Sequence, residues 1–287
     1  MIWQTSRFPI DLESPCVMGI VNATPDSFSD GGRHDTLAAA LRHCEQLLKD
    51  GAHILDIGGE STRPGSPSVS LDEELARVLP LVREAVSFAV PISVDTYKPQ
   101  VMQAVLDLGA DIINDIWALR QPGAANVIAA HPRCGVCLMH MHGEPLTMQT
   151  APMVGDVVKQ VLSFLELSAL DLQALAVKKS RIVIDPGIGF GKTVEQNFAL
   201  LANQSVLLSA GYPLLAGWSR KSSLGAVTGL DVKHRLMPSV AAAVLAVERG
   251  ASVVRVHDVR DTVAALAVWS AARPATGLQG SMNGSKG

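Results

Sequence analysis

Two short stretches near the end of the sequence carry residues that could bind an anion. Arg255 and His257 lie two positions apart on an apolar run, so a strand would place both side chains on one face and Val254 and Val256 on the other. An arginine beside a histidine supplies bidentate contacts to phosphate oxygens. Residues 219–221, Ser-Arg-Lys at the expected opening of a helix, add a hydroxyl, backbone donors and positive charge. Both stretches predict a phosphate site. For Arg255 and His257 the alternative is a solvated rim that pairs with Asp258 or Asp261.

Polar residues also follow the other short apolar runs. A single polar residue at a strand end is ordinarily a satisfied hydrogen-bonding group, but one on nearly every run is typical of enzymes that build their site on strand-end loops. The residues concerned are Asn22, Asp56, Asp95, Asn114, Asp115, His140 and Asp185. We therefore expect a shared site at this end of the strands.

The segment DPGIGFGKT, residues 185–193, contains glycines in a spacing that excludes nucleotide-binding loops. The position where a Walker A motif needs its first glycine is Pro186, and Lys192 stands where a GxGxxG motif needs its last. Closely spaced glycines still allow a flat ligand to approach the backbone near Phe190. The segment is interpreted as a pocket wall.

The elements that must position these residues alternate between short apolar runs and longer amphipathic stretches, the order of βαβ units around a parallel sheet. Eight of each predict an α/β fold, a single-domain (β/α)₈ TIM barrel, and the 287 residues agree with that fold. A doubly wound sheet is the alternative. The predicted strands are 17–21, 53–57, 92–94, 111–114, 136–139, 181–184, 214–217 and 253–256. The predicted helices are 37–49, 72–88, 99–108, 123–131, 154–177, 195–209, 233–248 and 261–272.

The barrel domain is predicted to span residues 15–272, between a lead-in at 1–14 and a Gly/Ser-rich tail at 273–287 that we expect to be disordered. Two long loops follow the first two strands, NATPDSFSDGG from Asn22 and GGESTRPGSPSVS from Gly58. Loops of this length are commonly functional. Both are predicted to close over the site.

Composition excludes several classes of protein. With 24 Lys and Arg against 27 Asp and Glu, the net charge of −3 gives no basic surface for nucleic acid. No apolar run approaches the roughly 18 residues of a membrane helix, and no leader pattern opens the chain. We expect a cytoplasmic protein without membrane or nucleic-acid partners. Cys134 and Cys137 form a CxxC pattern that leads into a predicted strand, so they are interpreted as structural.

Seven motifs taken together resemble the dihydropteroate synthase family of pterin-binding enzymes. In chain order they are MGIVNATPDSFSDGG, DIGGESTRPG, SVDTYKP, INDI, DPGIGFGK, SRKS and RVHDV, and they cover roughly residues 15–272. The resemblance implies a cytoplasmic, homodimeric transferase of folate biosynthesis. It would join (7,8-dihydropterin-6-yl)methyl diphosphate to 4-aminobenzoate, require Mg²⁺, and be a target of sulfonamide inhibitors.

The family's site residues carry over to positions that match its motifs. For the pterin the resemblance implies Asp95, Asn114, Met139, Asp185, Phe190, Gly217 and Lys221. For the diphosphate it implies Asn22, Arg63, Ser219, Arg255 and His257, with Asn22 also a ligand of Mg²⁺. For 4-aminobenzoate it implies Phe28, Thr62, Pro64, Phe190 and Ser222. Catalytic roles fall to Asp95, Arg63, Lys221, Arg255 and His257.

Three residues depart from the family pattern, namely His142, Trp117 and Trp218. None carries an assigned role, so they put the local shape of the pocket in doubt rather than the reaction. Two rival functions remain at this point. A folate-binding barrel that transfers a methyl group to a corrinoid would share the pterin carboxylates but not the cationic residues, and an inactive binding paralogue would share the fold alone.

Overall fold

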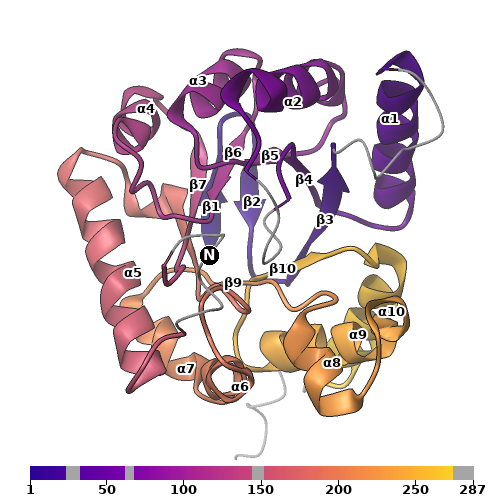
Figure 1. Ribbon diagram of the computed structural model, residues 1–287, viewed down its shortest axis with the longest axis vertical. Helices are drawn as coiled ribbons and strands as arrows, with labels where there is room; N and C mark the ends of the chain where they lie inside the picture. The colour runs from indigo at the N-terminus through magenta and orange to yellow at the C-terminus, as the bar shows by residue number, and fades with distance from the viewer. Residues whose placement is uncertain (24–32, 62–67, 144–151, 274–287) are drawn as a thin grey trace, which may run out of the picture.

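Eight parallel strands form the centre of the molecule. The computed structural model describes residues 1–23, 33–61, 68–143 and 152–273. The strands lie in the sheet order β8-β7-β6-β5-β4-β3-β10-β9, and the helices surround them (Figure 1). The strand bounds are β3 Cys16–Asn22, β4 Ile54–Gly58, β5 Ile92–Asp95, β6 Ile112–Asp115, β7 Gly135–Met139, β8 Ile182–Asp185, β9 Leu215–Ala216 and β10 Val253–Val256.

The two ends of this sheet meet. A parallel bridge joins Ile184 in β8 to Leu214, the residue before β9, and so brings the edge strands together. The first and last barrel strands are also paired, with Val253 of β10 opposite Cys16 of β3. The predicted (β/α)₈ barrel is therefore confirmed, and a doubly wound open sheet is excluded.

The helices lie outside the barrel, and all eight predicted stretches contain one. Their bounds are α1 Arg33–Lys49, α2 Leu71–Ala85, α3 Pro99–Asp107, α4 Ala124–Ala130, α5 Val157–Ala174, α6 Val194–Ala202, α7 Gln204–Leu207, α8 Ser222–Thr228, α9 Leu236–Glu248 and α10 Val259–Ala271. Among the described helices, none combines the length and the apolar character needed to cross a membrane.

The prediction of one continuous helix over 195–209 was wrong. The helix breaks at Asn203, between α6 and α7, where the backbone leaves the helical region. Both the backbone N–H and the side-chain amide of Asn203 donate to the carbonyl of Ala199. An asparagine that bonds its own backbone in this way competes with continuation of the helix.

The strands alternate between two environments because successive side chains point to opposite faces. Residues such as Val254 and Val256 pack outward against the helices in the main apolar core. Residues of the other parity face the barrel interior, where a compact apolar layer contains Met18, Ile54 and Val253. One strand period beyond that layer the interior becomes polar, with Asp56 after Ile54 and Arg255 after Val253. The same alternation that fills the barrel thus supplies its polar mouth.

The first residues of the chain form an antiparallel hairpin of β1 (Ile2–Gln4) and β2 (Pro9–Asp11), seen within the ring of strands in Figure 1. Trp3 has no exposed surface, packs with the interior layer, and donates its indole N–H to the carbonyl of Arg181 at 2.9 Å. The hairpin therefore covers the end of the barrel opposite the polar mouth. Its strands are too short for their alternation to have been recognised in the sequence.

We expect Trp3→Ala to reduce the free energy of unfolding by about 3–5 kcal/mol, because it removes a fully buried aromatic side chain and leaves a cavity below the barrel. Urea denaturation followed by circular dichroism would measure this. Ile2→Ala is the matched control, since Ile2 is 47% exposed on the same strand, and it should change stability by less than about 0.5 kcal/mol. Equal effects of the two substitutions would contradict the role given to Trp3.

Candidate active site

A guanidinium between two carboxylates lies at the polar mouth of the barrel. Arg255, from β10, donates through Nε to Asp56 of β4 at 2.5 Å and through Nη2 to Asp95 of β5 at 2.7 Å. Asp56 also accepts from the Ser93 hydroxyl at 2.6 Å and from the Asn114 amide at 3.3 Å. One network therefore connects β10, β4, β5 and β6, and it contains Asp95, Asn114 and Arg255 from the predicted site.

The charges of this network are strongly perturbed. Burial raises the pKa of Asp95 above the ordinary carboxyl range, and the Arg255 guanidinium offsets only part of that rise. The two carboxylates hold the pKa of Arg255 above its already high ordinary value, so the guanidinium stays charged. The second oxygen of Asp95, Oδ1, is buried and has no hydrogen-bond partner among the described residues. Asp95 therefore has an acceptor that an N–H donor of a ligand would satisfy.

The second buried carboxylate, Asp185, ends β8 beside the glycine-rich segment. Its Oδ1 accepts the backbone N–H of Gly187 at 2.7 Å, and burial raises its pKa while nearby cations including Lys221 oppose the rise. The ammonium of Lys221 lies 4.2 Å from the centre of the Phe190 ring, a cation–π contact. A Cβ atom at Gly189 would meet the Lys221 side chain at 3.2 Å. The predicted pterin residues Asp185, Phe190 and Lys221 are thus gathered around one tightly packed loop.

The apolar part of the mouth contains Met139 and Phe190 in one buried cluster with Ile116 and Met141. Tyr97 and Trp117 pack against this cluster, with their ring centres 5.0 Å apart. Gly217 follows β9 directly and Asn22 ends β3, so both lie at the same end of the barrel. Phe28, Thr62, Arg63 and Pro64 lie outside the described residues, and their assignments stay predictions.

The residues predicted to bind phosphate do not all point into the mouth. The Ser219 hydroxyl lies 2.9 Å from Nδ1 of His257 and accepts the His257 backbone N–H at 3.1 Å, so these two residues form one unit. Arg220 instead forms an exposed ion pair with Asp258, at 2.6 Å. Asp258 is therefore paired with Arg220, whereas Arg255, for which a solvated rim was the alternative, points its guanidinium at the buried carboxylates. Ser222 is the first residue of α8, and Lys221 is its N-cap.

Asp56 is the residue whose importance the sequence did not reveal. It appeared among the strand-end polar residues, but it received no role, because its partner Arg255 lies 199 residues away. It is fully buried and is held by Arg255, Ser93 and Asn114. We assign it the positioning of Arg255.

The three residues that depart from the family pattern lie in different surroundings. Trp117 borders the apolar part of the mouth, as described above, and its buried indole N–H has no partner among the described residues. Trp218 is buried against Phe198 of α6, with ring centres 5.2 Å apart. His142 is exposed. Trp117 is therefore the departure that bears on the shape of the mouth.

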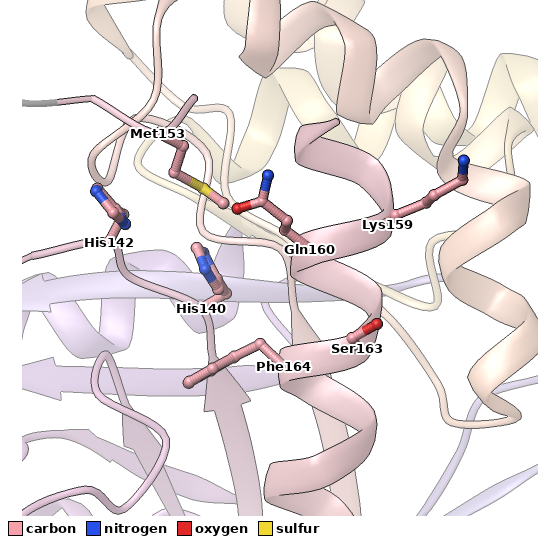
Figure 2. A pocket seen from close by; sticks show the side chains of 7 residues that line it. All are labelled: His140, His142, Met153, Lys159, Gln160, Ser163 and Phe164. Carbon is pink, nitrogen blue, oxygen red and sulfur yellow. The ribbon is translucent and has the colours of Figure 1, made fainter. Parts of the chain in front are cut away.

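A cavity of about 430 Å³ lies beside the mouth, where the connection after β7 meets α5 (Figure 2). Figure 2 shows His140 and His142 on one side of it and Gln160 and Phe164 of α5 on the other. Burial and nearby cations lower the pKa of His140 to about 2, so its imidazole is neutral. None of the buried charged residues described above lines this cavity, and we place the chemistry at the strand ends rather than in it.

Comparison with known proteins identifies the family. A family model described as "Pterin binding enzyme" matches residues 18–257. The "Dihydropteroate synthase" of Neisseria meningitidis serogroup C is 50% identical over 274 residues, covering 94% of this chain and 97% of that protein. The chain belongs to the dihydropteroate synthase family.

Solved structures of the dihydropteroate synthase family agree with this fold. The Burkholderia cenocepacia dihydropteroate synthase complexed with 7,8-dihydropteroate has a TM-score of 0.86 and 51% identity, covering 94% of this chain and 95% of that one. The Yersinia pestis enzyme in a sulfonamide drug complex has a TM-score of 0.89 and 44% identity, covering 94% and 98%. The family, the TIM-barrel fold and the transferase class predicted from the sequence are confirmed.

We expect Asp56→Asn to lower kcat/KM by about 10- to 100-fold, because the amide cannot hold the Arg255 guanidinium as a carboxylate does. Steady-state assays of the dihydropteroate synthase reaction would measure this. Asp258→Asn is the matched control, since it weakens the exposed ion pair with Arg220. Such a pair contributes less than about 1 kcal/mol to stability. Loss of activity in the control but not in Asp56→Asn would contradict the assignment.

Proposed function

We propose that this chain condenses (7,8-dihydropterin-6-yl)methyl diphosphate with 4-aminobenzoate, at the strand-end mouth, to give 7,8-dihydropteroate and diphosphate. The observation that carries the assignment is the contact between Arg255 and Asp95. It joins a carboxylate suited to the pterin to a cation suited to the leaving group, so the two ends of one substrate fit within one network. The relative from Burkholderia cenocepacia is complexed with the product of this reaction, 7,8-dihydropteroate.

The pterin is bound between the two buried carboxylates. Its amino group and ring N–H groups are donors, which Asp95 and Asp185 accept, and the unpartnered Oδ1 of Asp95 is one such acceptor. Asn114 and Lys221 offer donors to the ring nitrogens and the carbonyl of the pterin. Met139, Phe190 and Gly217 form the walls against its flat faces.

The amine substrate lies between the pterin and the opening of α8. Phe190 and Ser222 contact 4-aminobenzoate in this proposal, together with Phe28, Thr62 and Pro64 of the two long loops. Its carboxylate lies near the start of the helix that begins at Ser222. Sulfonamides compete for the same position, as supported by the relative solved in a sulfonamide drug complex.

The reaction is a substitution at the pterin methylene carbon. The bond from that carbon to the diphosphate oxygen breaks first, and the electron pair leaves with diphosphate. Asp95 stabilises the resulting cation electrostatically. The nitrogen of 4-aminobenzoate then forms the new C–N bond, and the anilinium proton passes to water or to phosphate. Catalysis requires no strong general base, and exclusion of water protects the cation.

The departing diphosphate is held by Arg255, His257, Ser219 and Arg63. The two described hydrogen bonds of Arg255 use two of the five N–H donors of a guanidinium, so further donors remain for phosphate oxygens. Lys221 adds positive charge at the same mouth.

The residues present fit a magnesium ion held mainly by substrate. Asn22 supplies an amide oxygen, and the described residues contain no group of three or more His, Cys, Asp or Glu side chains placed to hold a metal. Mg²⁺ commonly keeps several waters and binds through one or two protein oxygens and substrate phosphates. We propose Asn22 and the diphosphate oxygens as the ligands that would hold it, and it would neutralise the charge of the leaving group.

The proposal is tested by diphosphate release from the pterin substrate in the presence of Mg²⁺ and 4-aminobenzoate. We expect release by the wild type to depend on the amine and to fall by at least about 100-fold in Asp95→Ala and in Arg255→Ala, because each removes charge complementary to the transition state. A chelator should suppress release without abolishing pterin binding. Wild-type protein that binds pterin but releases no diphosphate would favour a binding protein instead.

We also propose that the chain is a homodimer. Five apolar residues in or between α8 and α9 are exposed, namely Val227, Leu230, Val232, Leu236 and Met237. Exposed apolar clusters of this kind are typical of protein interfaces.

Size-exclusion chromatography with light scattering would test the dimer. We expect Met237→Glu to shift the protein from dimer to monomer, because Met237 is 73% exposed within this cluster and a charge there opposes burial. Val206→Glu, on α7, should leave the dimer intact. A wild type that is monomeric at every concentration would refute the proposal.

A further inference from the structure

Lys192 is a lysine buried in the protein beside the mouth. Its side chain is 3% exposed, and its ammonium donates to three backbone carbonyls, those of Gly187 at 2.8 Å, Phe190 at 3.1 Å and His140 at 3.3 Å. Lysine is rarely buried to this degree unless its charge is satisfied. An apolar side chain would fill the same space without the cost of burying an ammonium, so packing alone does not explain a lysine here.

The three carbonyls converge because the glycine-rich segment lies directly against the connection after β7. A Cβ atom at Gly187 would meet the carbonyl oxygen of His140 at 1.9 Å, and one at Gly191 would meet that of His142 at 2.4 Å. Both glycines have positive φ angles, 67° and 70°. The glycines thus permit the close approach, and Lys192 donates to all three of the carbonyls that it brings together.

The segment that Lys192 holds also positions the pterin carboxylate. Gly187 donates its N–H to the Asp185 side chain at 2.7 Å, and His140 donates its N–H to the Asp185 carbonyl at 3.0 Å. Phe190, whose carbonyl Lys192 holds, carries the ring that contacts Lys221. Each residue that Lys192 binds is therefore linked by one hydrogen bond or one ring contact to a residue proposed to bind the pterin.

We propose that Lys192 is a positioning residue for pterin recognition: it fixes the 187–190 segment against the β7 strand end and so sets the placement of Asp185 and Phe190. The inference rests on the proposed function of that pocket. Lys192 does not touch the substrate in this proposal.

The electrostatic surroundings agree with this role. Burial lowers the pKa of Lys192 to about 7, the Asp185 carboxylate favours the charged form, and Lys221 disfavours it. In turn the Lys192 charge is one of the causes that lower the pKa of His140. Asp185 and the three carbonyls thus offset only part of the cost of burying the ammonium.

The test compares wild type with Lys192→Met, which keeps the length but removes the donors, and Lys192→Gln, which keeps N–H donors without the charge. We expect the Kd for a dihydropterin lacking the diphosphate, measured by titration calorimetry, to rise about tenfold or more in Lys192→Met, as for other residues that orient a binding group. Lys192→Gln should restore part of the affinity. Lys178→Met, at an exposed lysine, should leave the Kd unchanged.

In titration calorimetry the binding stoichiometry reports the fraction of protein that is folded, and the Kd is obtained separately. A change in Kd therefore indicates a change in the site rather than a loss of folded protein. A Lys192→Met protein with a lowered Tm, reduced binding stoichiometry and an unchanged Kd would overturn the proposal and make Lys192 a purely structural residue. Diphosphate release by the wild type is measured in parallel. If the wild type binds pterin without releasing diphosphate, the proposed reaction fails while the Kd comparison still decides the role of Lys192.

Discussion

A charged guanidinium shared by two buried carboxylates holds the mouth of this barrel in one arrangement. Each of these charges would be costly to bury alone, and each is tolerated because the others lie within hydrogen-bond distance. Burial nevertheless raises the pKa of Asp95, and this carboxyl keeps an oxygen without a partner among the described residues. The three charged groups therefore hold one another in place, while the open oxygen of Asp95 leaves an acceptor for a hydrogen-bond donor of a ligand.

The geometry behind that network is the two-residue period of the strands. Ile54 and Val253 fill the interior, and the next residues of the same parity, Asp56 and Arg255, open into the mouth. The apolar layer excludes water from below, which strengthens the electrostatic interactions above it. The residues that fill the interior and the residues that form the site thus lie on the same face of the same short strands, two positions apart. A shift of the strand register by one residue would displace both sets.

Much of this was predictable from the sequence, and the reasons for the failures are physical. The strands and their polar ends were recognised because alternation and strand-end position are local properties. The β1–β2 hairpin was not, since three-residue strands carry too little periodicity. The Asp56–Arg255 pair depends on which strands become neighbours when the sheet closes. The partners of Lys192 are backbone carbonyls, which every residue has, so the sequence cannot indicate them. The break at Asn203 required knowing that its side chain bonds the preceding turn.

The N-terminal β1–β2 hairpin beneath the barrel also limits the order in which the chain can fold. The indole of Trp3 bonds to the carbonyl of a residue 178 positions later, and β3 has no neighbour on one side until β10 exists. Contacts of such sequence separation are slow to form, since the intervening chain must first be confined. During synthesis the contact of Trp3 with Arg181 and the pairing of β3 with β10 therefore cannot form until most of the protein has emerged. The N-terminal hairpin therefore docks late, and until then the open edge of β3 can pair with other newly made chains.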